Sequence, residues 1–274
     1  PYQQTYTCAG ATFKRRGFFA RVRLEDFGPA GTIHPHEQTF SGPKEDRLKL
    51  IRATQANISP VFGLYDDAAN DVTDLLFEAV HLSPPTARAE LPTQDGKATV
   101  LSELWTVTDP AVIGDIQKMM AAKHVYIADG HHRYTTSLNY RKEVTVARGA
   151  APAADDPVNQ CLFVLIALQD PGLIILPTHR VVASASLHDF YLEAFREAAD
   201  KTCIITETKF RGDSLPMLEQ ELAGFGPHAM GMYDPIEDTA IVIRPRAADP
   251  LDAFKDRSEE RRVGHACRSR WSPS

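Results

Sequence analysis

The chain has 274 residues, of which 43% are hydrophobic and 24% are charged, and its formal net charge at pH 7 is −6. This length allows one large domain or two smaller ones, and the composition is ordinary for a globular protein in water. The acidic charge argues against binding nucleic acid through bulk electrostatics, and no apolar run reaches the roughly 18 residues of a membrane span. We therefore expect neither a nucleic-acid partner nor a membrane, and the oligomeric state stays open.

The four cysteines are Cys8, Cys161, Cys203 and Cys267, and no two of them have the C-x-x-C spacing of zinc sites and redox motifs. No secretory signal peptide is recognisable near the N-terminus. These features predict neither a disulfide framework nor a structural metal, and they favour a reducing, cytoplasmic location.

The hydrophobic pattern of the first half predicts alternating strands and helices. In chain order we expect a strand at 19–25, an edge strand or loop at 32–40, a helix from 44 to about 57, a strand at 60–65, a helix at 72–82, a hairpin turn at 95–96 with its return strand at 99–107, a helix from 110 to about 122 capped by Asp109, and a strand at 125–128. A helix then runs on from residue 131.

The second half continues with a buried strand at 161–168, a turn, and a return strand at 173–176. The order of predicted elements then changes, with a helix at 188–199, a strand at 203–208, a helix at 215–223, and strands at 229–233 and 239–243. The fold class is therefore α+β (mixed α/β), with a core over 1–185 and a smaller α/β subdomain over 186–256. Residues 257–274 resemble the translation of a sequencing adapter, and we expect them to lie outside the fold.

The most informative stretch joins the apolar run at 125–128 to Asp129-Gly130 and a polar segment that is compatible with a helix. A strand, a tight glycine turn and a helix start form an anion site, because free N–H groups and the helix dipole point at one spot. With Asp129 as N-cap, the side chains of His131 and His132 diverge by about 100° and are poorly placed to bind one metal ion.

This geometry predicts a phosphate site made by Asp129, Gly130, His131, His132 and Arg133, in which Arg133 offers a bidentate fork. The plain structural alternative is equally open. In it, Asp129 only caps the helix, the histidines bond to the backbone, and Arg133 pairs with a carboxylate such as Glu37.

Two further polar clusters follow apolar runs. In His34-Pro35-His36-Glu37, the Glu37 carboxylate could act as a general base that a neighbouring histidine such as His36 orients, and the spacing of His34 and His36 also allows metal ligation. In Pro177-Thr178-His179-Arg180, His179 and Arg180 could complete an anion pocket. The alternatives are an exposed polar loop for the first cluster and a simple turn for the second.

The ordered motifs of the chain resemble those of the domain of unknown function 1015 family of bacteria and archaea. The resemblance is carried by Ile127-Ala128-Asp129-Gly130-His131-His132-Arg133-Tyr134, His34-Pro35-His36-Glu37-Gln38-Thr39, Pro43-Lys44-Glu45-Asp46-Arg47, Asn57-Ile58-Ser59-Pro60-Val61-Phe62 and Leu176-Pro177-Thr178-His179-Arg180. Family members usually begin with a further segment that contains a PPYD-like motif. The resemblance therefore implies that this chain is a fragment truncated at its N-terminus.

The Asp-Gly-His-His-Arg core is also similar to the phosphate-binding box of ParB/sulfiredoxin-like folds, which include CTP-binding partition proteins, sulfiredoxin and free-serine kinases. This similarity implies a ParB/sulfiredoxin-like core and a nucleotide-phosphate site at residues 130–133. It does not establish a kinase.

Three functions remain open. The first is a phosphotransferase or nucleotide hydrolase that uses ATP, ADP or CTP with Mg²⁺ and acts on a small molecule, with Glu37 as the base. The second is a metal-dependent hydrolase with His34, His36, Asp129 and His179 as ligands. The third is a nucleotide-binding regulator without catalysis.

Overall fold

The computed structural model describes residues 1–8, 10–36, 41–93, 96, 98–175, 192–208, 222, 224–226, 228–234 and 239–247. The chain divides between residues 176 and 177 into two compact units. The expected boundary at residue 185 and the segment 257–274 lie outside the described residues. In the part of the chain that is described, no helix is long and apolar enough to cross a membrane.

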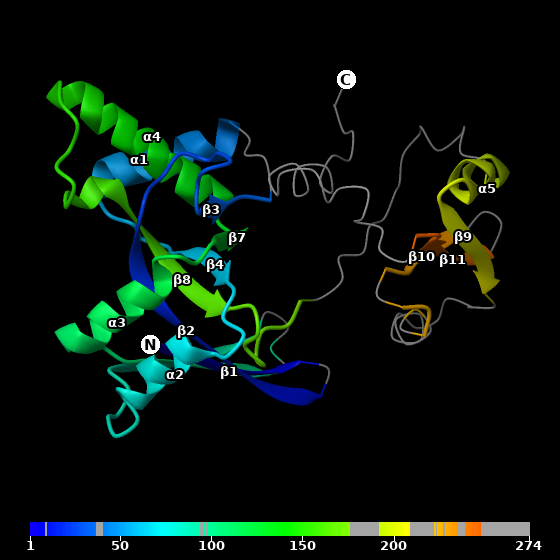
Figure 1. Cartoon of the computed structure of the whole chain (residues 1–274), viewed down its shortest axis with the longest axis horizontal. Helices are drawn as coiled ribbons and strands as arrows, with labels where there is room; N and C mark the ends of the chain where they lie inside the picture. Colours follow the sequence, from blue (N-terminus) through cyan, green and yellow to red (C-terminus); the bar gives the residue numbers. More distant parts are fainter. Residues whose placement is uncertain are drawn as a thin grey trace. The chain divides into compact units, whose positions relative to one another are not determined.

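The first unit is built on an eight-stranded mixed sheet with the order β3-β7-β4-β8-β2-β1-β6-β5 (Figure 1). The strands are β1 (Tyr2–Cys8), β2 (Ala11–Arg23), β3 (Ile33–His34), β4 (Val61–Tyr65), β5 (Ala87–Pro92), β6 (Thr99–Leu104), β7 (Val125–Asp129) and β8 (Gln160–Ala167). β3 is parallel to β7 and β4 is parallel to β8, whereas the other neighbours are antiparallel. The short β3, which Pro35 follows, lies at one edge as expected.

The first unit contains the α-helices α1 (Ser41–Thr54), α2 (Asp71–Glu78), α3 (Pro110–Met120) and α4 (His131–Arg148), and a 3₁₀ turn, η1 (Pro157–Asn159). α1 lies beside α4, and α2 lies beside α3 (Figure 1). The Asp109 carboxylate accepts the N–H of Ala111 at 2.8 Å, so the expected N-cap of α3 is confirmed. The mixed α/β class is likewise confirmed, and a ParB/sulfiredoxin-like core stays a prediction.

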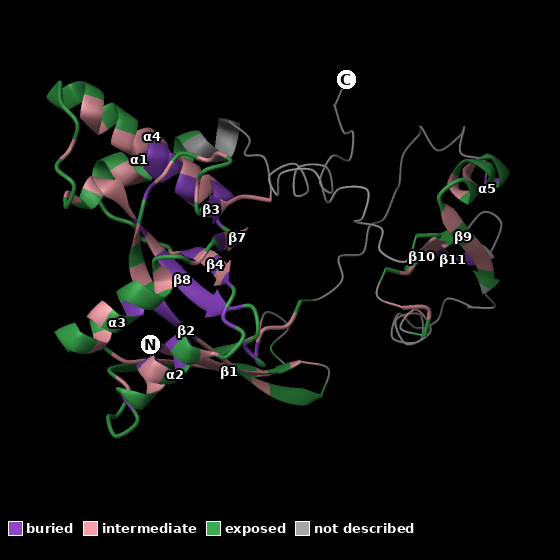
Figure 2. Ribbon diagram, viewed as in Figure 1, coloured by how far each residue is buried: buried purple, intermediate pink, exposed green. Residues whose placement is uncertain are grey.

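The core of the first unit lies between the helices and one face of the sheet. Residues that alternate along β4, β7 and β8 turn to this face, among them Val61, Tyr65, Val125, Ile127 and Phe163. Helix residues complete the cluster, which includes Val72, Leu76, Ile116, Tyr134 and Leu138. The purple segments of Figure 2 follow these strands and the sheet-facing sides of the helices. α4 is therefore fixed on the sheet by its apolar residues.

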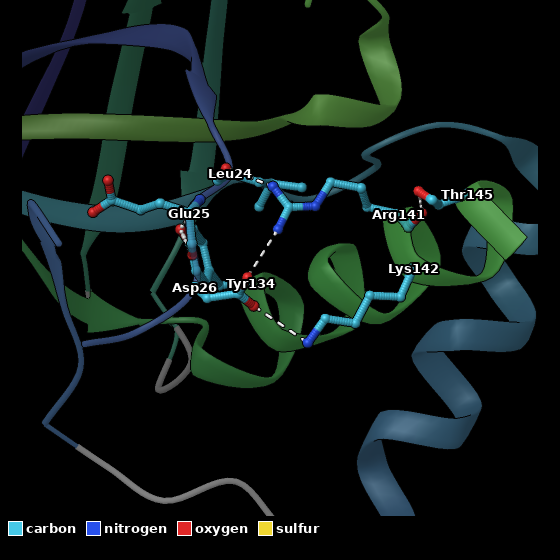
Figure 3. Close-up of polar contacts among 7 residues, drawn as sticks. All are labelled: Leu24, Glu25, Asp26, Tyr134, Arg141, Lys142 and Thr145. Atoms are coloured by element: carbon cyan, nitrogen blue, oxygen red, sulfur yellow. Dashed lines mark hydrogen bonds and ion pairs between the residues drawn. The ribbon is translucent and has the colours of Figure 1, made fainter. Parts of the chain in front are cut away.

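Polar contacts also fix α4 to the end of β2 (Figure 3). The buried Tyr134 hydroxyl accepts the backbone N–H of Glu25 at 3.0 Å and donates to the Glu25 carbonyl at 2.9 Å. Two turns further along the helix, Arg141 donates to the Leu24 carbonyl at 2.6 Å, and Lys142 pairs with Asp26 at 3.2 Å. Burial raises the pKa of the Tyr134 phenol well above its usual value. These contacts hold α4 against the segment that follows β2.

Residues 173–175 are not in a strand, so the expected return strand at 173–176 is wrong over these residues. The turn before them docks on the β1–β2 hairpin through side chains. Gly172 accepts the Tyr6 hydroxyl at 2.6 Å, and a Cβ on Gly172 would lie 2.1 Å from the Lys14 carbonyl oxygen. Asp170 accepts the N–H groups of Arg16 and Gly172. The turn's contacts with the hairpin thus take the place of strand pairing.

The second unit contains α5 (Leu192–Asp200), β9 (Cys203–Thr208), β10 (Met230–Asp234) and β11 (Thr239–Pro245). The strands form an antiparallel sheet with the order β10-β11-β9. Leu192, Ile241 and Ile243 form its small core. The three strands match those that the hydrophobic pattern predicted, and most of the expected helix at 215–223 lies outside the described residues.

Candidate functional site

The carboxyl end of β7 is joined to α4 by a single residue, Gly130. This residue is the N-cap of α4 and has φ 96° and ψ 24°, in the left-handed region. A Cβ at this position would lie 2.9–3.1 Å from atoms of the Arg133 guanidinium. Both the backbone angle and the close arginine favour glycine here. The N–H groups of the first turn of α4 have no acceptor within the helix, so this junction has the geometry of an anion site.

The expectation that Asp129 caps α4 is wrong. Asp129 is the last residue of β7, and no side chain caps the helix. The glycine takes the cap position because the chain must reverse between strand and helix within one residue, which the left-handed conformation achieves. The Asp129 carboxylate pairs instead with Arg133 at the exposed side of the junction.

The Arg133 guanidinium is engaged by three partners within the protein. Its Nη1 donates to Ser59 Oγ at 2.9 Å and to the Pro60 carbonyl, and its Nη2 pairs with Asp129. The Arg133 side chain is mostly buried, whereas that of Asp129 is 75% exposed. Arg133 thus ties the start of β4 to α4, and an anion at the junction would share this guanidinium with Asp129.

His36 and His131 meet edge to face on the other side of β7, with their ring centroids 4.5 Å apart. The backbone N–H of His36 donates to His131 Nε2 at 3.2 Å, and His36 Nδ1 bonds to the Ile127 carbonyl at 2.7 Å. Because a carbonyl only accepts, this contact places a proton on Nδ1 and leaves the lone pair of the neutral ring on Nε2. This contact and the packing on His131 fix the His36 ring beside the first residue of α4.

His34 belongs to a separate cluster. Its Nε2 lies 2.6 Å from His124 Nδ1, and its ring stacks on those of His124 and Tyr126. His34 thus contacts His124 and Tyr126, whereas His36 contacts Ile127 and His131. Among the described residues, no group of three or more His, Cys, Asp or Glu side chains could hold a metal ion. The described residues therefore offer no support for the metal-dependent hydrolase.

The first two turns of α4 contain three buried polar atoms that have no hydrogen-bond partner among the described residues: His132 Nδ1, Thr135 Oγ1 and Thr136 Oγ1. A buried polar group without a partner costs about 1–3 kcal/mol, so such groups are rare and call for an explanation such as a bound water, ion or ligand. Of the ten such atoms among the described residues, three lie within these five residues at the start of α4.

A cavity of about 70 Å³ opens between α1, the segment that follows α1, and the start of α4. Its lining residues are Arg47, Leu50, Ile51, Ala56, Asn57, Ile58, Ser59, Arg133, Thr136 and Ser137. Behind this lining, Ser137 Oγ lies 3.4 Å from Asn57 Oδ1 and 3.5 Å from the buried Cys161 sulfur. Burial raises the pKa of the Cys161 thiol, which favours its protonated form.

The described residues thus bring together Asp129, Gly130, His131, His132, Arg133 and His36. Glu37, His179 and Arg180 lie outside the described residues, as does Thr178, so whether they approach the junction stays a prediction. Sequence reasoning missed the roles of Asn57, Ser59 and Thr136. The segment Asn57-Ile58-Ser59-Pro60 had been singled out as a motif, and a polar motif just before a buried strand was the signal that could have located them.

Neither the curated proteins nor the solved structures include a match to this chain. A family model described as a protein of unknown function, DUF1015, matches residues 1–258. This match covers both compact units and all the motifs at the β7–α4 junction. The chain therefore belongs to the DUF1015 family, which the sequence motifs had indicated.

Proposed function

We propose that the protein binds the phosphate groups of a nucleotide at the start of α4 and transfers or hydrolyses the terminal phosphoryl group. The observation that carries the proposal is the junction at Gly130, where a left-handed glycine at the end of β7 opens a helix beside Arg133. Backbone N–H groups at such a turn, together with the helix dipole, favour a phosphate. The unpartnered atoms in the next two turns support the same location.

Each residue has a role in this proposal. The N–H groups of His131, His132 and Arg133 hold phosphate oxygens, and the Arg133 guanidinium balances their charge. His36, held by the Ile127 carbonyl, or Glu37 accepts a proton from the attacking hydroxyl or water. Mg²⁺ binds through phosphates, waters and one or two carboxylates, and the exposed Asp129 fits that need.

A second candidate is a nucleotide-binding regulator without turnover. One observation favours it: Arg133, a cation at the helix start, is already engaged by Ser59, Pro60 and Asp129. An arginine that is held by three protein groups can bind a phosphate where it lies, but it is less free to move with a phosphoryl group during transfer. In this alternative, the nucleotide changes the Arg133 contacts and thereby the link between β4 and α4.

The test is a calorimetric titration of the protein with ATP, ADP and CTP, each with Mg²⁺, followed by the same titration of Gly130→Ala. We expect at least one nucleotide to bind, and we expect Gly130→Ala to weaken binding by at least about tenfold because the new Cβ displaces Arg133 and strains the turn. Absence of binding at millimolar concentration of all three nucleotides would sink the proposal.

Gly149→Ala is the matched control. Gly149 ends the same helix, has φ 66°, and has nothing within 4 Å of an added Cβ. It therefore imposes a similar backbone strain far from the junction, and we expect nucleotide affinity to stay within about twofold. Release of phosphate or phosphorylation of a small acceptor then distinguishes the enzyme from the regulator, which binds nucleotide without consuming it.

A further inference from the structure

The cavity between α1 and α4 lies beside the proposed phosphate site and has chemistry of its own. We propose that this cavity binds a small organic carboxylate. The two sites share Arg133, whose side chain lines the cavity and whose guanidinium lies against Gly130. The inference goes beyond nucleotide binding, because Arg47, Asn57 and the apolar lining residues take no part in the proposed phosphate site, whereas Arg133 and its partner Ser59 contact both.

The charges around the cavity favour an anion. Arg47 and Arg133 line it, and no carboxylate is among its lining residues. Arg133 is neutralised by Asp129, but within the described part of the chain no carboxylate lies within ion-pair distance of Arg47. Arg52, five residues further along α1, differs: it pairs with Glu143 at 2.6 Å and with Glu45 at 3.3 Å. Arg47 is thus the cation at this cavity that an anionic ligand could pair with.

The polar groups of the wall complement that charge. The Asn57 side-chain oxygen accepts from Ser137 Oγ and the Cys161 sulfur, and no hydrogen bond of its NH₂ group occurs among the described residues. Thr136 lines the cavity, is only 3% exposed, and has a hydroxyl with no partner among the described residues. Donors without a competing carboxylate suit a ligand rich in acceptors.

The size and the apolar walls of the cavity determine the kind of anion. Pockets for drug-sized ligands measure about 300–1,000 Å³. At about 70 Å³ this cavity is much smaller than such pockets and suits a ligand of a few heavy atoms. Leu50, Ile51 and Ile58 line it, and Leu50 and Ile58 are 41% and 62% exposed. Large apolar side chains exposed at the rim of a pocket favour a ligand with a short hydrocarbon part over an inorganic anion.

The test uses butyrate as the probe, with butyramide as its uncharged analogue and inorganic phosphate as an anion without hydrocarbon. Titrations are followed by amide chemical-shift changes in ¹⁵N-labelled protein. We expect butyrate to bind in the millimolar range and to shift amides of α1, of residues 56–59 and of the start of α4. We expect Arg47→Met to weaken butyrate binding by at least about tenfold and Arg52→Met, the matched control on the exposed face of α1, by less than twofold.

Three outcomes would overturn the assignment. Equal binding of butyrate and butyramide would show an apolar cavity without charge selection. Phosphate binding as tight as that of butyrate, and equally dependent on Arg47, would show an inorganic anion site. Shifts that survive Arg47→Met would place butyrate elsewhere. A nucleotide titration of the same sample tests the junction at Gly130 separately, so either proposal can fail while the other stands.

Discussion

The two halves of α4 differ in how their polar side chains are satisfied. In the C-terminal half every charged side chain has a partner. Arg141 and Lys142 pair with Asp26 (Figure 3). Glu143 pairs with Arg52, and Arg148 pairs with Asp156. In the N-terminal half His132, Thr135 and Thr136 each bury a polar atom that has no partner among the described residues. The charged side chains of the second half are thus paired within the described chain, whereas the first half leaves three buried polar atoms without a partner there.

We infer from this difference that the C-terminal half of α4 anchors the helix, whereas the N-terminal half serves the proposed binding site. Paired charges at the surface contribute little free energy individually, but they hold the helix in register against α1 and β2. Unpaired buried groups cost free energy in the unbound protein and persist where they serve a ligand. Substitutions in the C-terminal half should therefore change stability alone, whereas substitutions of residues at the Gly130 junction, such as Arg133, should change ligand binding.

The largest effect is expected at Arg133, which both links α4 to the start of β4 and lies at the proposed phosphate site. Arg133→Lys keeps the charge but cannot reach Ser59, Pro60 and Asp129 at once, because lysine lacks the planar fork. We expect a loss of about 2 kcal/mol in the free energy of unfolding, from hydrogen bonds to a charged group, and about tenfold weaker nucleotide binding. Chemical denaturation and calorimetry measure the two effects.

Arg148→Lys is the control for Arg133. Arg148 ends the same helix and pairs with one carboxylate, that of Asp156, which a lysine can also meet. Both quantities should stay close to wild type. Loss of stability in Arg133→Lys with unchanged nucleotide affinity would make Arg133 a purely structural residue and remove it from the proposed site.

The next largest effect is expected at Tyr134, which faces the sheet. Tyr134→Phe removes the hydroxyl that bonds to both the N–H and the carbonyl of Glu25, and it leaves these backbone groups short of partners. We expect the free energy of unfolding to fall by about 1–3 kcal/mol, with nucleotide affinity unchanged. Urea denaturation checks this, with Tyr140→Phe as the neutral control, since no hydrogen bond of the Tyr140 hydroxyl occurs among the described residues. Equal stability of the two variants would contradict the anchoring role.

A smaller effect of opposite sign is expected at Thr136. Thr136→Val keeps the shape and removes a buried hydroxyl that has no partner among the described residues. We expect the unbound protein to gain up to about 1 kcal/mol, since the cost of the unpaired group disappears. Thr145→Val in the other half removes a hydroxyl that donates to the Arg141 carbonyl at 2.8 Å, and we expect no gain there. Destabilisation by Thr136→Val would mean that this hydroxyl already has a partner.

The smallest effect concerns pH and the exposed pair of Arg52 and Glu143. The hydrogen bond from Arg52 lowers the pKa of Glu143 below its usual value. A carboxyl whose pKa is lower in the folded state stabilises the protein above its unfolded-state pKa of about 4.3, and this contribution disappears as pH falls through the folded pKa. The small stability difference between wild type and Glu143→Gln should therefore be constant above about pH 5 and vanish in acid. Denaturation curves at several pH values check this, and a difference that grew in acid would contradict it.

Much of the local structure was predictable. The hydrophobic pattern located β4, β7, β8 and β9, the Asp109-Pro110 pair located the start of α3, and the mixed α/β class followed. The strand–glycine–helix junction at Gly130 was also predictable, because few residues other than glycine fit such a turn. The N-cap at Asp129 was predicted wrongly, because residue type alone does not show which of two adjacent residues adopts the left-handed conformation.

The sequence by itself determined the family, the fold class and the place of the candidate site, because these depend on residue periodicity and on motifs contiguous in the chain. Only the tertiary structure decided the partners of the site residues. The sheet order places β3 on one side of β7 and β4 on the other, so His36 and Ser59 reach the start of α4 from 95 and 74 residues away. That order also made the cavity beside Arg47, because it brings α1 against α4. Such contacts depend on strand register and helix packing, which no single stretch of sequence contains.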